Sequence, residues 1–178
     1  AVSDEVPVGQ SVFFRSLFAL LPIVVFLALR REFPQGLATR RPLGHALRSG
    51  LGAAAMFASF AAVAVLPVAE TTLLAQLTPI FMALGGVLLL GERFTWVRAL
   101  AMGLAMGGMA VLVLPNVGGA SQSGQLVGYL LAVLSAVLTA GALLTVRRIS
   151  RTETPGAIAF YFILVSALAG LATLPLGW

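Results

Sequence analysis

The sequence predicts an all-α integral membrane protein, a polytopic transmembrane helical bundle of about six helices. Of its 178 residues, 60% are hydrophobic and only 10% are charged, whereas a soluble domain carries roughly 25% charged residues. The apolar residues form long uninterrupted blocks, and one helical crossing of a bilayer requires about 20 such residues. Because the blocks are continuous rather than alternating in polarity, they predict helices and not the strands of a barrel.

Six hydrophobic segments follow one another along the chain, and each is expected to cross the membrane once. They cover residues 11–29, 49–66, 71–90, 97–114, 126–146 and 156–176. Only the first carries a charge well inside its apolar run, at Arg15. Small residues recur at every fourth position in three segments: Gly50, Ala54, Ala58 and Ala62; Gly128, Ala132, Ala136 and Ala140; and Gly103 and Gly107. Such stripes let helix backbones approach closely in lipid, so we expect them at helix contacts.

The arginines predict how the bundle is oriented. The connectors at 30–48, 91–98 and 147–154 hold five, two and three arginines, whereas those at 1–10, 67–70 and 115–125 hold none. The two sets alternate along the chain, and short positively charged loops stay cytoplasmic. All eleven basic residues are arginine, which together with the bias to Ala, Gly, Leu and Val is typical of a GC-rich bacterial genome. We therefore expect a multi-pass protein of the bacterial inner (plasma) membrane, with its arginine-rich loops in the cytoplasm.

Composition also argues against several functions. A net charge of +5 would suggest nucleic acid for a soluble protein, but here the charges lie in short connectors, and no nucleic-acid partner is expected. With no cysteine and a single histidine, neither a disulfide nor a metal site is expected. The sequence contains no paired-carboxylate site, no Ser/His/Asp set that the predicted topology could bring together, and no phosphate-binding loop. It therefore predicts neither an enzyme nor a cofactor, and no ATP-driven mechanism.

The first and last segments resemble each other. Glu5-Val6-Pro7 precedes the first and Glu153-Thr154-Pro155 precedes the last, and at the same spacing Phe13-Phe14 corresponds to Tyr161-Phe162. The arginines orient these two segments in opposite directions. Similar segments of opposite orientation are typical of the inverted repeats of secondary transporters.

Three stretches carry a resemblance to a known family. They are FFRSLFALLP (13–22), LPVAETTLLAQLTPIFMALGGVLLLGERFTWVR (66–98) and GLAMGGMAVLVLP (103–115). The second combines a proline-containing turn, Thr-Pro within the next helix and Gly-Glu-Arg at the end of that helix. In these features the segment from Phe13 to Pro115 resembles the EamA family of the drug/metabolite transporter superfamily.

The resemblance implies ten helices in two five-helix inverted repeats, of which this chain matches helices two to seven. Residues 1–115 would then be a first repeat without its first helix, 116–125 a periplasmic linker, and 126–178 the first two helices of the second repeat. It implies a secondary transporter that moves a small organic metabolite across the inner membrane by alternating access. Membrane lipid and a small-molecule metabolite are the expected partners. Six helices are not expected to transport alone unless two copies pair as a homodimer. The alternative is a non-transporting integral membrane protein that acts as a subunit of a larger complex.

Six residues are candidates for substrate binding or gating: Arg15, Glu70, Gln76, Thr78, Pro79 and Tyr161. A charge about one turn inside a membrane helix, as at Arg15, needs water, a partner or an anionic substrate. Alternatively, Arg15 snorkels outward or pairs structurally with Glu70, which the predicted topology places on the same side. Glu70 also suits the electrostatics of a helix N-terminus, because it precedes the third segment.

The third segment is expected to be interrupted. Pro79, near its middle, lacks an N–H and frees the carbonyl of Ala75, beside Gln76 and Thr78. Irregular backbone at mid-membrane needs neighbours or a water-filled cavity, and transporter sites use such broken helices. The alternative is a purely structural kink capped by Thr78. For Tyr161, periodicity leaves open whether the side chain faces a cavity or lipid.

Five further residues are expected to have structural roles. Glu92 and Arg93 would fix the geometry of a connector, and His45 would lie at a solvated helix start. Trp96 and Trp178 are expected to anchor the chain at the two membrane interfaces.

Overall fold

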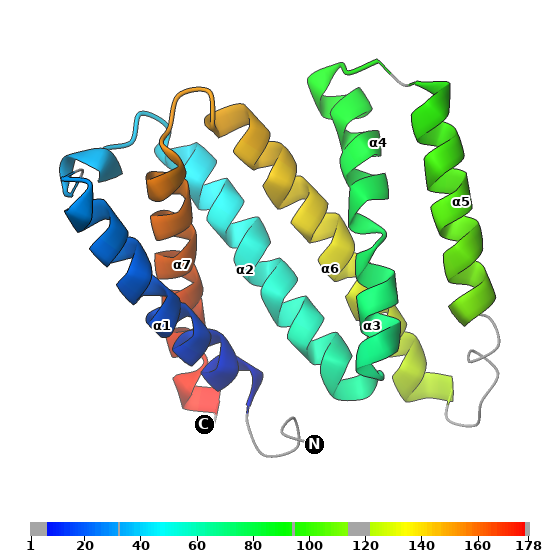
Figure 1. The fold of residues 1–178 in the computed structure, drawn as a ribbon. Coiled ribbons are helices and arrows are strands. Elements are labelled where there is room, and N and C mark those ends of the chain that lie inside the picture. Colours follow the sequence, from blue (N-terminus) through cyan, green and yellow to red (C-terminus); the bar gives the residue numbers. More distant parts are fainter. Residues whose placement is uncertain (1–6, 32, 94, 114–121, 177–178) are drawn as a thin grey trace.

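The computed structural model describes residues 7–31, 33–93, 95–113 and 122–176, and these are helical throughout apart from short connectors, as predicted. The helices are α1 (Val8–Leu29), α2 (Pro42–Val65), α3 (Val68–Ala75), α4 (Thr78–Leu90), α5 (Trp96–Val113), α6 (Gln122–Ile149) and α7 (Pro155–Ala172). Two single 3-10 turns, η2 (Gln35–Leu37) and η4 (Leu174–Leu176), follow α1 and α7 (Figure 1). Trp178 and residues 116–121 of the expected linker lie outside the described residues.

The predicted polytopic bundle is confirmed. Within the described residues, five candidate spans are long and apolar enough to cross a membrane: Val8–Leu29, Pro42–Val65, Val68–Leu90, Gln125–Ile149 and Pro155–Ala172. The third of these includes the break between α3 and α4. In the remaining predicted segment, the apolar stretch among the described residues is the shorter Ala99–Gly108 of α5.

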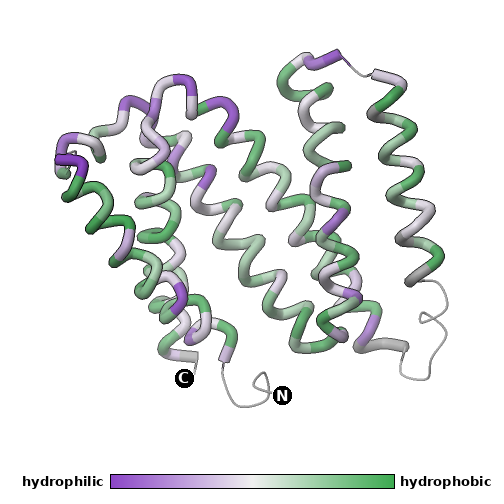
Figure 2. The backbone as a smooth tube through the Cα atoms, in the orientation of Figure 1, coloured by the Kyte–Doolittle hydropathy of each residue, from purple (hydrophilic) through white to green (hydrophobic). Residues whose placement is uncertain are grey.

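The connectors lie alternately at the two ends of the bundle (Figure 1). Those that follow α1, α4 and α6 share one end, and Figure 2 shows hydrophilic residues concentrated there. Apart from Arg48, which lies in the second turn of α2, the arginines that the sequence places in these three connectors therefore gather at a single end of the molecule, which we call the arginine end.

Two helix pairs form the packed part of the bundle, α2 along α6 and α1 along α7. Most of the small-residue positions of α2 and α6 lie in their contact: Ala58, Ala62, Ala132, Ala136 and Ala140 are buried. Gly50 and Ala54 are exposed. A contact through the α5 stripe is not found, since a Cβ at Gly103 or Gly107 would meet no atom of the described residues within 4 Å. The reason is that α5 stands at the edge of the bundle (Figure 1).

Glycine allows α1 and α7 to approach closely. A Cβ at Gly170 would lie 2.7 Å from the backbone nitrogen of Phe13 and 2.9 Å from its Cα. These are backbone atoms that cannot rotate aside, so the crossing depends on the absence of a side chain at Gly170. The two helices run in opposite directions (Figure 1), as the arginines of the connectors predict.

The largest differences from the predicted helix starts are at α2 and α6. Helix α2 starts at Pro42, before the expected residue 49, because proline is favourable in the first turn of a helix, where no N–H bond is lost. This start brings His45 and Arg48, assigned to a connector by the sequence analysis, into the helix. Helix α6 starts at Gln122, inside the stretch 116–125 that was expected to be a linker.

Candidate functional site

The third hydrophobic segment is interrupted, as Pro79 predicts. Helix α3 ends at Ala75 and α4 begins at Thr78. Across the break the backbone tightens, since the amides of Gln76 and Leu77 donate to carbonyls only three residues earlier, each over 3.0 Å. An irregular turn inside a membrane span is tolerated where water in a cavity or neighbouring helices form hydrogen bonds with its free backbone groups.

A cavity of about 300 Å³ lies beside this break, between α1, α2, α6 and α7. Its polar lining consists of Arg15, Arg48, Ser59, Thr78, Ser135 and Thr139. The remaining lining residues are Gly52, Ala55, Met56, Ala75, Ala136, Ala142, Leu143 and Phe162. No carboxylate is among these described lining residues, so two guanidinium groups give the cavity a positive charge.

Arg48 is the main candidate residue that sequence reasoning missed. Its guanidinium carbon lies 4.3 Å from the centroid of the Phe162 ring. The Nε and Nη1 atoms are buried and have no hydrogen-bond partner among the described residues. A cation–π contact contributes about 0.5–2 kcal/mol, but it leaves these donors unsatisfied, which costs about 1–3 kcal/mol. The aromatic ring thus holds Arg48 in place, while its Nε and Nη1 donors remain available for hydrogen bonds. Pro42, at the helix start, is the signal that could have placed it in a helix.

Gly52 makes room for this contact. A Cβ there would collide with Nη1 of Arg48 and lie 2.6 Å from Cε2 of Phe162. The position of the guanidinium in the cavity therefore depends on the missing side chain one turn further along α2.

Arg15 reaches the same cavity from α1. Its Nη1 donates to the thioether sulfur of Met56 over 3.0 Å, and a thioether is only a weak acceptor. The alternative of an ion pair with Glu70 is not found in the described structure. Glu70 instead accepts a hydrogen bond from the hydroxyl of Tyr129.

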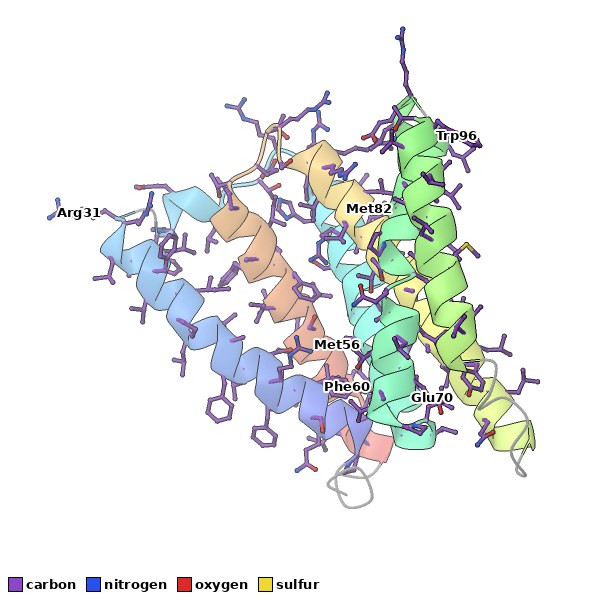
Figure 3. The ribbon with its side chains drawn as sticks, turned by 45° about the vertical axis from the view of Figure 1, so that its right-hand side comes forward. Arg31, Met56, Phe60, Glu70, Met82 and Trp96 are labelled. Atoms are coloured by element: carbon purple, nitrogen blue, oxygen red, sulfur yellow. The ribbon has the colours of Figure 1, made fainter. Side chains whose placement is uncertain are left out.

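Glu70 lies away from the cavity, in the first turn of α3, where its charge suits the helix N-terminus as expected. The Tyr129 hydroxyl donates to it over 2.7 Å and so joins α6 to α3. Figure 3 shows Glu70 at the end of the bundle opposite to Arg31 and Trp96. Beside this contact, buried apolar residues of α2, α3 and α6 pack together: Ala62, Leu66, Leu74 and Ala132. Both kinds of contact hold α2, α3 and α6 together at this end of the bundle.

The structure separates the other candidates. Thr78 lines the cavity with Arg15 and Arg48, whereas Gln76 ends α3 and is exposed. Pro79 faces a different cavity of about 250 Å³, together with Glu92. Trp96 is 80% exposed at the start of α5.

Tyr161 lies outside the cavity lining. Its hydroxyl donates to the carbonyl oxygen of Leu37 over 2.9 Å, and its ring centroid lies 4.8 Å from that of His45. The neighbouring Phe162 lines the cavity instead. Tyr161 therefore contacts the connector between α1 and α2 rather than the space beside Arg48.

His45 is buried, and the expectation of a solvated position is wrong. The ring is 3% exposed, and Nε2 lies 3.2 Å from Oε2 of Glu153. The reason is the early start of α2, which turns this residue toward the connector between α6 and α7. The other carboxylate oxygen of Glu153 accepts from the backbone N–H of Arg40 over 2.9 Å.

These contacts determine the pKa of Glu153. Desolvation raises the pKa of the buried carboxyl, but hydrogen bonds from Arg40, His45 and Thr39, with the charge of His45, outweigh it and lower the pKa below its usual value. Glu153 therefore connects two loops of the arginine end as a carboxylate. At the same end, Glu92 accepts from Arg147 over 3.0 Å and so joins the end of α4 to α6, which fits the structural role expected for it.

The fold and the cavity define a polytopic helical membrane protein with a charged site inside its bundle. Residues 1–114 match the EamA-like transporter family. The chain belongs to this family, which is one of transporters and not of enzymes, as the resemblance of residues 13–115 predicts.

Two curated relatives are similar over almost the whole chain. The pseudopaline exporter CntI of Pseudomonas aeruginosa, in strains UCBPP-PA14 and PAO1, is 32% identical over 178 residues. The match covers 99% of this chain and 58% of each relative, so the chain spans somewhat more than half their length. No solved structure matches the chain.

Proposed function

We propose that this chain forms part of a secondary transporter that exports a small anionic organic metabolite across a bacterial inner membrane by alternating access. The observation that carries the proposal is the pair of guanidinium groups, from Arg15 and Arg48, that line one cavity beside an interrupted helix. Family membership and the name of the relatives, which are exporters, support transport and its outward direction.

The expected charge of the substrate follows from the free-energy cost of placing two arginines inside a membrane protein. On insertion scales, an arginine in a membrane helix costs free energy, about 2.5–3.5 kcal/mol at the bilayer centre and less nearer the edge. Two of them share a cavity whose described lining holds no carboxylate. A substrate with a carboxylate or similar anionic group would neutralise this charge, and the planar guanidinium binds such groups through two parallel hydrogen bonds. The hydroxyls of Ser59, Thr78 and Thr139 add neutral polar groups for the rest of a small metabolite.

Alternating access is supported by three features. The broken span Val68–Leu90 is of the kind that forms substrate sites in transporters. Helices α1 and α7 pack together in opposite directions, as equivalent helices of two inverted repeats would. The Tyr129–Glu70 contact and the apolar cluster hold α2, α3 and α6 together at the end away from the arginines. We place the repeats at 1–115 and 126–178 and the arginine end in the cytoplasm.

The proposal is tested by comparing metabolites in a strain that lacks the full protein with those of its parent. An anionic metabolite should accumulate inside the deletion strain and be depleted from its medium, and the wild-type protein should restore export. Arg48→Gln, at matched membrane abundance, should not. If no metabolite depends on the protein, the transport proposal fails. If the dependent metabolite is neutral or cationic, transport stands and the assignment of an anionic substrate fails.

A further inference from the structure

A second positively charged region lies at the arginine end, apart from the cavity described above. A pocket of about 630 Å³ is lined by Arg41, Leu89, Leu90, Glu92, Arg147, Arg148 and Arg151. These residues come from the start of α2, the end of α4, and the end of α6 with the connector that follows it. Four arginines and one glutamate give the lining a net charge of +3 (4 − 1).

Two of these arginines form hydrogen bonds within the protein, and the other two are available to bind an anion. Arg147 donates to Glu92, and Arg148 donates through Nη2 to the carbonyl oxygen of Leu89 over 2.7 Å. These contacts hold the end of α6 against the end of α4. Arg41 and Arg151 are exposed, and among the described residues no hydrogen bond or ion pair of their side chains is found. The pocket therefore has a fixed wall and two guanidinium groups that have no partner within the described part of the chain.

An apolar groove continues from this pocket along the outside of α2 and α6. It has a volume of about 440 Å³ and shares Arg41 and Arg148 with the pocket. Its other lining residues are Arg40, Pro42, Leu43, Gly44, Leu47, Thr145 and Ile149. Leu43 and Leu47 are 84% and 57% exposed. The apolar part of the groove, from Leu43 to Leu47 and at Ile149, belongs to the ends of the candidate spans Pro42–Val65 and Gln125–Ile149. It therefore adjoins the charged pocket on the side of the spans.

We propose that the pocket and groove together bind an anionic phospholipid. Its phosphate would lie at Arg41 and Arg151, and an acyl chain would follow Leu43, Leu47 and Ile149. Basic pockets between membrane helices at headgroup level suit anionic lipid headgroups, and apolar side chains at the level of the hydrocarbon suit the chain of the same molecule. A soluble phosphate would use the charged pocket alone and leave the apolar groove empty. The continuity of the two therefore favours a lipid.

The test uses the full protein in detergent and native mass spectrometry of the lipid that it retains. Phosphatidylglycerol and phosphatidylcholine with identical chains are the probes. The wild-type protein should retain phosphatidylglycerol in preference, and Arg41→Gln/Arg151→Gln should lower that retention about 30-fold, since each arginine contributes about 1 kcal/mol to anionic lipid binding. Leu47→Gln, in the groove, should lower it as well.

The control is Arg30→Gln/Arg31→Gln, which removes the same charge at the same end but outside the pocket. It should retain phosphatidylglycerol as the wild type does, and gel filtration should show all variants monodisperse. Equal retention of the two lipids by the wild-type protein would overturn the proposal, and so would an equal loss in the control. Complete displacement of phosphatidylglycerol by glycerol 3-phosphate would also overturn it, because a soluble anion would then be the occupant. None of these outcomes depends on transport.

Discussion

The guanidinium of Arg48 lies over the ring of Phe162, with 4.3 Å between its central carbon and the ring centroid. The contact joins α2 to α7 at the edge of the cavity that Arg15 also lines. Because the partner of the charge is an aromatic face, the guanidinium keeps donors that a substrate can use. Where a substrate is needed, it is the metabolite that the comparison of strains identifies.

Phe162→Leu should weaken binding of the exported metabolite without abolishing it. The substitution removes the cation–π contact, which is worth about 0.5–2 kcal/mol, or about 2- to 30-fold in affinity. Phe162→Tyr retains an aromatic face and should bind as the wild type does. Phe160→Leu is the matched control, since Phe160 is not among the cavity-lining residues. Substrate titration of the purified full protein measures the affinities. Equal affinities for Phe162→Leu and the wild type would show that the contact does not position Arg48.

Gly52→Ala should reduce transport while every charged group of the cavity remains. The new methyl group would occupy the space of Arg48 Nη1 and of the Phe162 ring, so one of the two must move. Gly50→Ala, on the same helix, adds its methyl where no described atom lies within 4 Å. Export by cells that produce equal amounts of the two variants distinguishes them. Similar export would contradict the assigned geometry.

Gly170→Ala should destabilise the protein, because its methyl group would meet the backbone of Phe13 in α1. Overpacking of this kind costs about 1–3 kcal/mol. Gly103→Ala, in open space on α5, should be neutral or slightly stabilising, since alanine favours helix more than glycine does. Melting temperatures from gel filtration after heating compare the two. A Gly170→Ala variant as stable as the wild type would mean that α1 and α7 cross less closely than described.

Glu153 should contribute stability at neutral pH that is lost in acid. Its pKa in the folded protein lies below the ordinary value of 4.5, so the carboxylate form stabilises the fold above pH 4.5. This contribution decreases as the pH falls below 4.5 and through the lowered pKa. Glu153→Gln should therefore melt below the wild type at pH 7, and the gap should narrow toward pH 3. Glu92→Gln gives the reference for losing another carboxylate at the same end. A gap that stays constant over this pH range would contradict the proposed role of the carboxylate.

Much of the fold could be predicted because lipid imposes a simple rule on the sequence. Long apolar runs mark the spans. Pro79 marks the break between α3 and α4, because proline has no backbone N–H to donate within an unbroken helix. The arginine-free and arginine-rich connectors separate to opposite ends of the bundle. Each of these features is determined by residues that are close together in the sequence.

The cavity was only partly predictable. The sequence identifies Arg15 and Thr78 as candidates. Arg48 follows a polar stretch with too few apolar residues for this part of the chain to be recognised as a membrane span. Its role depends on Phe162, which is distant in sequence, as Glu153 is from His45. Such pairs form only when helices pack, so single-segment patterns do not contain them.

The central claim is that Arg48 binds an anionic metabolite during transport. Proteoliposomes containing equal amounts of the full protein test it most directly, with Arg48→Gln compared with Arg30→Gln, which removes a charge outside the cavity. A hydrogen bond to a charged group contributes about 1.5–3 kcal/mol, so Arg48→Gln should lower substrate affinity and transport at low substrate about 10- to 100-fold. Arg30→Gln should transport as the wild type does. Wild-type transport of the anionic metabolite by Arg48→Gln would contradict the account.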